Sequence, residues 1–253
     1  MNNKDCDSVA LAAVNKARLC NEHLGRYMIR AIMAGFYIVV ATILSNMTAA
    51  VLLSTYPQWG KLLSSFLFAI AIILVVFMNG ELFTGNNFVM AMGAYKKKVS
   101  VKYMVKVWCL SYIGNFIGAF ILAALFVYSG VSHDILTDYY NSFIYGKLDI
   151  SALQLVIRGM MCNFLVCLAV FTGTKLKSES GKLIIMFFVI MTFVLSGFEH
   201  CVANMGTFSI AYMLLGNIGT AAVAKSMIFV TIGNILGGGV LFGLPLYLSE
   251  LDK

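Results

Sequence analysis

Apolar runs alternate with short polar segments along the whole chain. Four of these runs have the length of one membrane-spanning helix: 31–53, 104–128, 151–173 and 226–248. About 20 apolar residues suffice to cross a hydrocarbon core roughly 30 Å thick. Each run therefore predicts one transmembrane helix, and Arg158 lies within the first two turns of the third.

Two further runs are too long to be single spans. Residues 62–95 carry one charge, Glu81, and a continuous helix would be about 51 Å long at ~1.5 Å per residue. Residues 183–224 carry Glu199 and would reach about 63 Å. Glycine and polar residues interrupt both runs, at 79–87 and at 196–204. We expect six spans with broken second and fifth helices, because non-helical backbone at membrane depth is tolerated only inside protein or beside a water-filled cavity.

The two halves of the chain resemble each other. Three ordered sets of residues match: Arg30 and Phe36 with Arg158 and Phe164, Glu81 and Asn86 with Glu199 and Asn204, and Ile113-Gly114-Asn115 with Ile232-Gly233-Asn234. Three spans per half is an odd number, so the halves insert in opposite orientations and form an inverted repeat. Gly114 and Gly118, like Gly233 and Gly237, have the spacing that permits close helix packing, within the bundle or between subunits.

Composition supports a membrane protein. Of 253 residues, 60% are hydrophobic and 11% are charged, whereas soluble domains carry about 25% charged residues. A soluble enzyme, a nucleic-acid-binding protein and a disordered chain are therefore excluded. Fourteen of the 18 Lys and Arg residues, Lys253 among them, fall on one side of the predicted spans. This bias places both termini in the cytoplasm.

These patterns predict one transmembrane channel domain over residues 1–253. Its parts are a cytoplasmic segment 1–27, a first repeat 28–128, an extracytoplasmic loop 129–150 and a second repeat 151–248. The six cysteines show no CxxC spacing, and His200 is the one histidine within a span. We therefore expect neither a metal site nor a cofactor, since either would need several ligands.

The two breaks are the candidate functional site. After each break, the second half-helix begins near the membrane midplane with its partly positive N-terminus facing the centre, which favours an anion. His200 and Thr84 are polar groups at this depth. Glu81 and Glu199 would repel an anion, so we expect them to support the loops through backbone N–H groups or asparagines. Lys147 either draws anions toward the outer mouth or is a solvated surface lysine.

The segments 80–87 and 197–205, together with 158–163, resemble the signature segments of the formate/nitrite transporter family. The resemblance implies an all-α, aquaporin-like protomer of six helices, a homopentamer with one pore per protomer, and a place in a bacterial-type plasma (inner) membrane. It also implies passage of small monovalent anions of weak acids: formate, nitrite and hydrosulfide. Within the family, the hydrosulfide-conducting members are the closer comparison.

The resemblance also assigns roles by position. Thr84 and His200 correspond to a central threonine–histidine pair. The apolar constrictions correspond to Leu82, Phe83 and Phe193, with Phe68, Ile72 and Val166 as further candidates. Asn163 and Asn204 correspond to pore-facing asparagines, and Lys147 to a vestibule lysine.

Three functions remain as alternatives. In the first, a proton from His200 or from nearby water converts the anion to its neutral acid, which crosses the apolar constriction. In the second, the pore passes a neutral solute such as water or ammonia. The third is an intramembrane enzyme that uses Ser196 and His200, but no GxSG nucleophile motif is present. We expect a non-enzyme.

Overall fold

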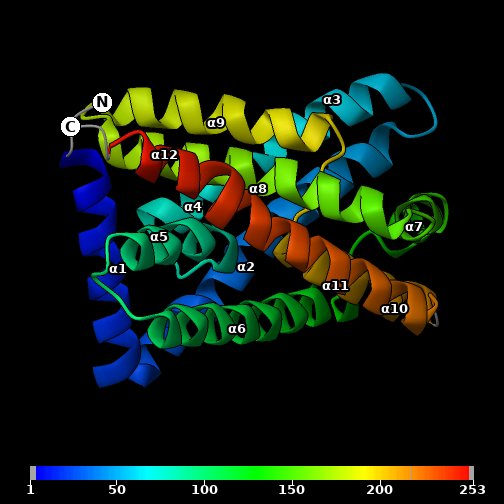
Figure 1. The fold of residues 1–253 in the computed structure, drawn as a ribbon. Helices are drawn as coiled ribbons and strands as arrows, with labels where there is room; N and C mark the ends of the chain where they lie inside the picture. The colour runs from blue at the N-terminus through cyan, green and yellow to red at the C-terminus, as the bar shows by residue number, and fades with distance from the viewer. Residues whose placement is uncertain (1–3, 217, 251–253) are drawn as a thin grey trace.

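All the regular secondary structure in the described part of the chain is helical. The computed structural model describes residues 4–216 and 218–250, and no strand occurs among them (Figure 1). The helices are α1 (Lys4–Glu22), α2 (Leu24–Leu52), α3 (Pro57–Phe68), α4 (Ile70–Phe77), α5 (Phe83–Tyr95), α6 (Val101–Tyr128), α7 (His133–Leu148), α8 (Ala152–Lys175), α9 (Glu179–Leu195), α10 (Cys201–Leu215), α11 (Thr220–Ile235), the π-helical η1 (Leu236–Gly243) and α12 (Leu244–Leu248). Lys253, which contributes to the orientation argument, lies outside the described residues.

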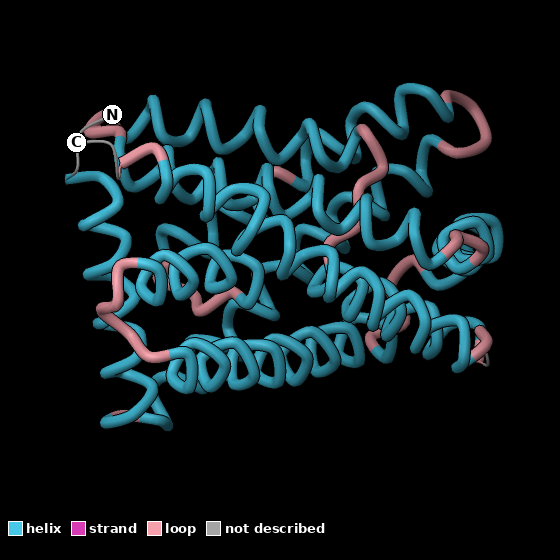
Figure 2. The backbone as a smooth tube through the Cα atoms, in the orientation of Figure 1, coloured by secondary structure: helices cyan, strands magenta, loops and turns pink. Residues whose placement is uncertain are grey.

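The expected all-α architecture with six spans is confirmed, including the two breaks. Five helical segments have the length and composition to cross a membrane: Leu24–Leu52, Pro57–Phe77, Val101–Tyr128, Ala152–Lys175 and Thr220–Leu248. Shorter helices, α9 and α10, form the remaining span. Figure 2 shows loops inside the bundle at both interruptions. Asn79 and Gly197, at equivalent positions of the two halves, have left-handed backbones with φ of 53° and 74°. A left-handed residue ends a helix, which explains why both half-helices stop there.

The small-residue motifs pack helices within the protomer. Helix α2 packs against α6, and α8 packs against α11. Gly118 lies against the main-chain carbonyl of Ile32, and Gly237 lies against that of Met160. A Cβ atom at either glycine would overlap these carbonyl groups. The sequence left open whether these glycines pack helices within the bundle or between subunits. The structure shows packing within the bundle.

Two predicted boundaries are wrong. The run 183–224 was expected to form one broken span, but α10 ends at Leu215 and the last helix begins at Thr220 instead of 226. Gly216 and Gly219, with φ of 76° and 87°, make this turn. The turn has no charged residue, so hydropathy alone does not reveal it.

The expected outer loop 129–150 consists mainly of α7. This helix buries one face, formed by Leu136, Tyr140 and Ile144, against its neighbours. Figure 1 shows α7 at one end of the bundle and α1 across the opposite end, near both termini. The spans thus have one additional helix at each end.

Ion pairs attach α1 to the rest of the chain. Lys96 lies 2.8 Å from Asp7 and 2.8 Å from Glu250, and Lys175 lies 2.9 Å from Asp5. Burial, together with Glu250, raises the pKa of the Cys6 thiol to about 12. Burial disfavours charge on Glu250, but hydrogen bonds from Cys6 and Lys96 outweigh it and hold the pKa of this carboxyl below its ordinary value.

Candidate functional site

Two asparagines hold the broken helices in place. Asn115 Oδ1 accepts a hydrogen bond from Phe83 N–H at 2.9 Å, and its Nδ2 donates to the carbonyls of Ala31 and Glu81 at 2.8 and 3.0 Å. Asn115 is fully buried. Phe83 is the first residue of α5, so this bond satisfies an N–H that has no partner within the helix.

Asn234 repeats this arrangement in the second half. Its Oδ1 accepts from Cys201 N–H at 2.9 Å, and its Nδ2 donates to the carbonyls of Gly159 and Glu199, both at 2.9 Å. Cys201 is the first residue of α10. Each break is therefore fixed by one buried side chain with three hydrogen bonds.

Each of the two carboxylates that match across the repeat belongs to a lysine–glutamate–asparagine group. Glu199 Oε2 lies 2.6 Å from Lys147 Nζ and accepts from Asn204 Nδ2 at 2.9 Å. Glu81 Oε2 lies 2.7 Å from Lys16 Nζ and accepts from Asn86 Nδ2 at 3.2 Å. 

The two groups match across the inverted repeat, although their lysines come from α1 and α7, outside the matched segments. The bonds from Asn86 and Asn204 are of the kind expected for the two glutamates, and the structure adds a lysine partner to each. Lys147 is also not a solvated surface lysine, because its side chain is only 14% exposed and is paired with Glu199.

Thr84 and His200 meet at the centre of the molecule. Thr84 Oγ1 lies 3.0 Å from His200 Nε2, and both residues are buried. Thr84 is in the first turn of α5 and His200 is the N-cap of α10. The partly positive N-termini of both half-helices therefore converge on this pair.

The hydrogen bonds assign the protonation of the neutral His200 ring. Ala203 N–H donates to His200 Nδ1 at 3.1 Å, so Nδ1 is an acceptor and carries no proton. The ring proton is then on Nε2, which donates to Thr84 Oγ1. The Thr84 hydroxyl hydrogen remains available to a further acceptor.

Two cavities approach this pair from opposite ends. The α1-side cavity, of about 310 Å³, is lined by α1 residues such as Lys16 and by Glu81 and Leu82. The α7-side cavity, of about 510 Å³, is lined by Lys147, His200 and other residues. Asn204 and Phe193 also line the α7-side cavity. The two cavities share no lining residue.

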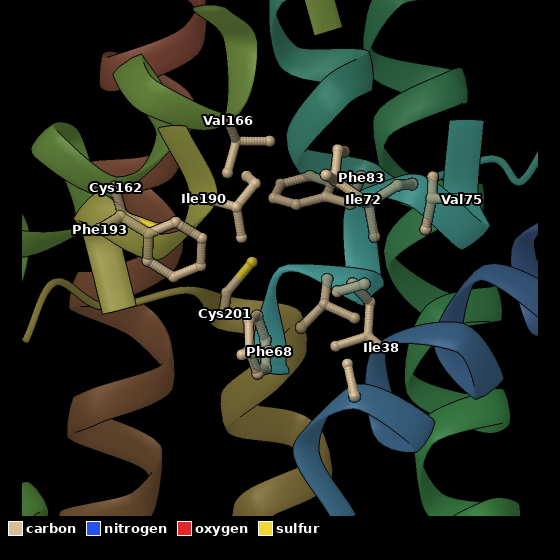
Figure 3. Close-up of a cluster of buried hydrophobic side chains, with 14 of the residues drawn as sticks. Ile38, Phe68, Ile72, Val75, Phe83, Cys162, Val166, Ile190, Phe193 and Cys201 are labelled. Atoms are coloured by element: carbon tan, nitrogen blue, oxygen red, sulfur yellow. The ribbon is translucent and has the colours of Figure 1, made fainter. Parts of the chain in front are cut away.

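Buried apolar side chains, among them Phe68, Val166 and Phe193, form a cluster (Figure 3) whose members contribute to the linings of both cavities. Phe68 and Phe193 pack edge to face with ring centroids 5.8 Å apart. Phe83 and Val166 are buried in the same cluster and line neither cavity. Ile72 lines the α1-side cavity, as Leu82 does. The residues expected at constrictions are thus gathered in this one cluster.

Asn163 is fully buried and lines neither cavity. Its Nδ2 donates to the main-chain carbonyl of Asn234 at 2.6 Å and lies within hydrogen-bond distance of the Thr84 carbonyl at 3.2 Å. Through these two carbonyls, Asn163 links the first break to the second half of the chain.

Sequence reasoning did not assign Lys16, Asn115 and Asn234 to the site. Both asparagines were visible as part of the repeat, where the Gly-Asn elements match. Lys16 had no such signal, because its partner Glu81 is 65 residues away.

Such an arrangement of inverted repeats, opposed cavities and a buried polar pair defines a membrane transport protein. The chain belongs to the formate/nitrite transporter family, whose model matches residues 3–248. It is 30% identical over 247 residues to the nitrite transporter NirC of Escherichia coli (strain K12), covering 94% of this chain and 90% of that protein. 

Solved structures show the same fold. An FNT family ion channel superposes with a TM-score of 0.91 at 26% identity, covering 98% of this chain and all of that one. A pentameric formate channel with formate bound gives a TM-score of 0.76 at 29% identity, covering 89% and 97%. The family consists of membrane transporters and channels for anions, and this chain is a multi-pass member.

Proposed function

We propose that the chain forms a pore for small monovalent anions of weak acids, with formate, nitrite and hydrosulfide as the candidates. The protomers assemble as a homopentamer with one pore each, as does the similar pentameric formate channel. Both termini are cytoplasmic, so the α1-side cavity opens inward and the α7-side cavity outward. The observation that carries the proposal is the Thr84–His200 pair, at which two helix N-termini converge between two cavities.

The electrostatics of the centre favour an anion. Each half-helix N-terminus contributes roughly half a positive charge, and both face the same point. Glu81 and Glu199 do not oppose this field strongly, because Lys16 and Lys147 neutralise them at 2.7 and 2.6 Å. An anion therefore gains stabilisation as it approaches the pair from either cavity.

The apolar cluster, in contrast, disfavours an anion. Moving a bare anion among Phe68, Phe193 and Val166 costs several kcal/mol or more, because no polar group replaces its hydration. A neutral acid avoids most of this penalty. The anion accordingly takes up a proton before it crosses and releases the proton on the other side.

The bulk solution, from which a proton enters the cavity and to which it returns on the other side, is a better proton source than His200. Protonating His200 at Nδ1 would remove the acceptor that Ala203 N–H uses and would place a charge in a buried ring. We therefore assign His200 the role of a neutral Nε2–H donor that orients Thr84. The Thr84 hydroxyl is then directed to the permeating species as donor.

Anion flux into proteoliposomes tests the proposal through Thr84→Val, which keeps the shape of the side chain and removes the hydroxyl. We expect formate flux to fall about tenfold, the equivalent of roughly 1.4 kcal/mol for one lost hydrogen bond. Thr192→Val is the matched control, since its exposed hydroxyl bonds only within its own helix, to the Phe188 carbonyl. Equal fluxes for Thr84→Val and the parent would contradict the proposed site.

A further inference from the structure

The vestibule lysines carry little net charge into the two cavities. Lys16 and Lys147 each lie within 2.7 Å of a glutamate, at 2.7 Å from Glu81 and 2.6 Å from Glu199. Seen from the cavity, each pair is a neutral dipole, whose field falls off faster than that of a single charge. Long-range attraction of an anion from bulk water, beyond the local field of the two helix N-termini, therefore depends on charges other than these two pairs.

Arg30 and Arg158 are the matching arginines of the two repeats. Glu81 N–H donates to the main-chain carbonyl of Arg30 at 3.2 Å, and Glu199 N–H donates to that of Arg158 at 3.3 Å. Each arginine is thus fixed at the base of the loop that carries the corresponding glutamate. Arg30 and Arg158, which match in the sequence, therefore also accept equivalent main-chain hydrogen bonds.

The two arginines line opposite cavities. Arg30 lines the α1-side cavity and Arg158 lines the α7-side cavity. Among residues 4–216 and 218–250, neither arginine forms an ion pair with a carboxylate. Unlike the lysines, the two arginines are therefore not neutralised by a directly paired carboxylate.

Counting the charged residues of each lining gives the same result. The α1-side cavity has Lys16 and Arg30 against Glu81, a net charge of one positive. The α7-side cavity has three cations, Lys61, Lys147 and Arg158, against Glu199, a net charge of two positive. Lys61 lies near the N-terminus of α3. Arg158 lies closer to the central pair, because its carbonyl accepts a hydrogen bond from Glu199, the residue before His200.

We propose that Arg30 and Arg158 are the residues that concentrate anions in the two cavities, while Lys16 and Lys147 hold the loop glutamates in place. This inference rests on the proposed function, since it assigns a role within anion permeation. A cavity with uncompensated charge of one sign raises the local concentration of the opposite ion, and added salt screens the effect. Guanidinium groups remain charged throughout the physiological pH range.

The test compares formate flux in proteoliposomes at about 20 mM and about 300 mM ionic strength, where the Debye length changes several-fold. For Arg30→Gln with Arg158→Gln, we expect flux at low salt to fall about three- to tenfold, and to differ from the parent by less than about twofold at high salt. Arg30→Lys with Arg158→Lys keeps both charges and should retain the parent flux and its salt dependence. Arg26→Gln is the control, because Arg26 is exposed and lines neither cavity.

Two results would overturn the assignment of the arginines. One is parent-like flux of the glutamine variant at both salt concentrations. The other is an equal loss at both concentrations that the lysine variant does not restore, which would indicate a structural role. Should the double glutamine variant fail to fold, each single variant replaces it under the same criteria. A parent flux no greater than that of empty liposomes for every anion would instead contradict the proposed function itself.

Discussion

The asparagines at the two breaks permit a quantitative prediction. Asn234→Leu keeps a similar volume but removes every polar atom of the side chain. Three hydrogen bonds are lost, with Cys201 N–H and with the carbonyls of Gly159 and Glu199. Asn115→Leu removes three equivalent bonds in the first half.

The expected cost follows from these counts. Hydrogen bonds inside membrane proteins contribute on average about 0.6 kcal/mol each, and in soluble proteins about 1 kcal/mol. Three bonds therefore account for about 2–3 kcal/mol. The N–H of Cys201 is additionally left buried without a partner, which adds about 1–3 kcal/mol. We expect Asn234→Leu to lower the free energy of unfolding by about 3–6 kcal/mol.

Unfolding by SDS titration in mixed micelles measures this quantity. Because Asn115 makes the same three bonds, Asn115→Leu should give the same loss within about 1 kcal/mol. Asn141→Leu, on the exposed face of α7, is the control and should change the free energy by less than about 0.5 kcal/mol. A loss below about 1 kcal/mol for both buried asparagines would refute the reasoning that they hold the breaks.

Three further predictions concern other contacts. Glu250→Gln should lower the melting temperature at pH 7 by weakening the attachment of α1, and the difference from the parent should shrink and then vanish as pH falls through the lowered pKa of the parent carboxyl. The sign follows from the lowered pKa of Glu250, whose stabilisation is present above its unfolded-state pKa and is lost as pH falls. Gly118→Ala should lower the free energy of unfolding by about 1–3 kcal/mol, because the new methyl group overlaps the Ile32 carbonyl. Glu199→Gln should cost about 2 kcal/mol or more by the same assay, because it leaves Lys147 largely buried without its partner.

For each of these three predictions, one result would contradict the physical reason given. A melting-temperature difference for Glu250→Gln that does not depend on pH would show that charge is not the cause. A neutral effect of Gly118→Ala would mean that α2 and α6 can separate at little cost. An unchanged stability for Glu199→Gln would mean that the ion pair with Lys147 is not formed in the membrane.

The spans and their breaks were predictable because the bilayer imposes a simple rule on the sequence. A run such as 62–95 exceeds the membrane thickness, and polar residues in its middle mark the place where the helix must end. The repeat in the sequence also identifies Glu81 and Glu199 as equivalent. The turn around Gly216 was not predicted, because it contains no charged residue.

The side-chain partners were less predictable, since they depend on how distant segments pack. Lys16 reaches Glu81 only because α1 folds back across the end of the bundle, which hydropathy does not indicate. Lys147 similarly depends on α7, which the sequence suggested only as a loop. Asn163 was expected to face the pore, a role that its buried bonds to the Thr84 and Asn234 carbonyls do not suggest.

The most direct test of anion permeation is a flux measurement on the parent protein in proteoliposomes at two pH values. Formate, nitrite and hydrosulfide are compared with a neutral solute of similar size, with empty liposomes as reference. We expect flux of the weak-acid anions that is accompanied by proton movement and is faster at the lower pH, with much slower flux of the neutral solute. Flux of the neutral solute alone, or anion flux that is independent of pH and moves no protons, would contradict the proposed function.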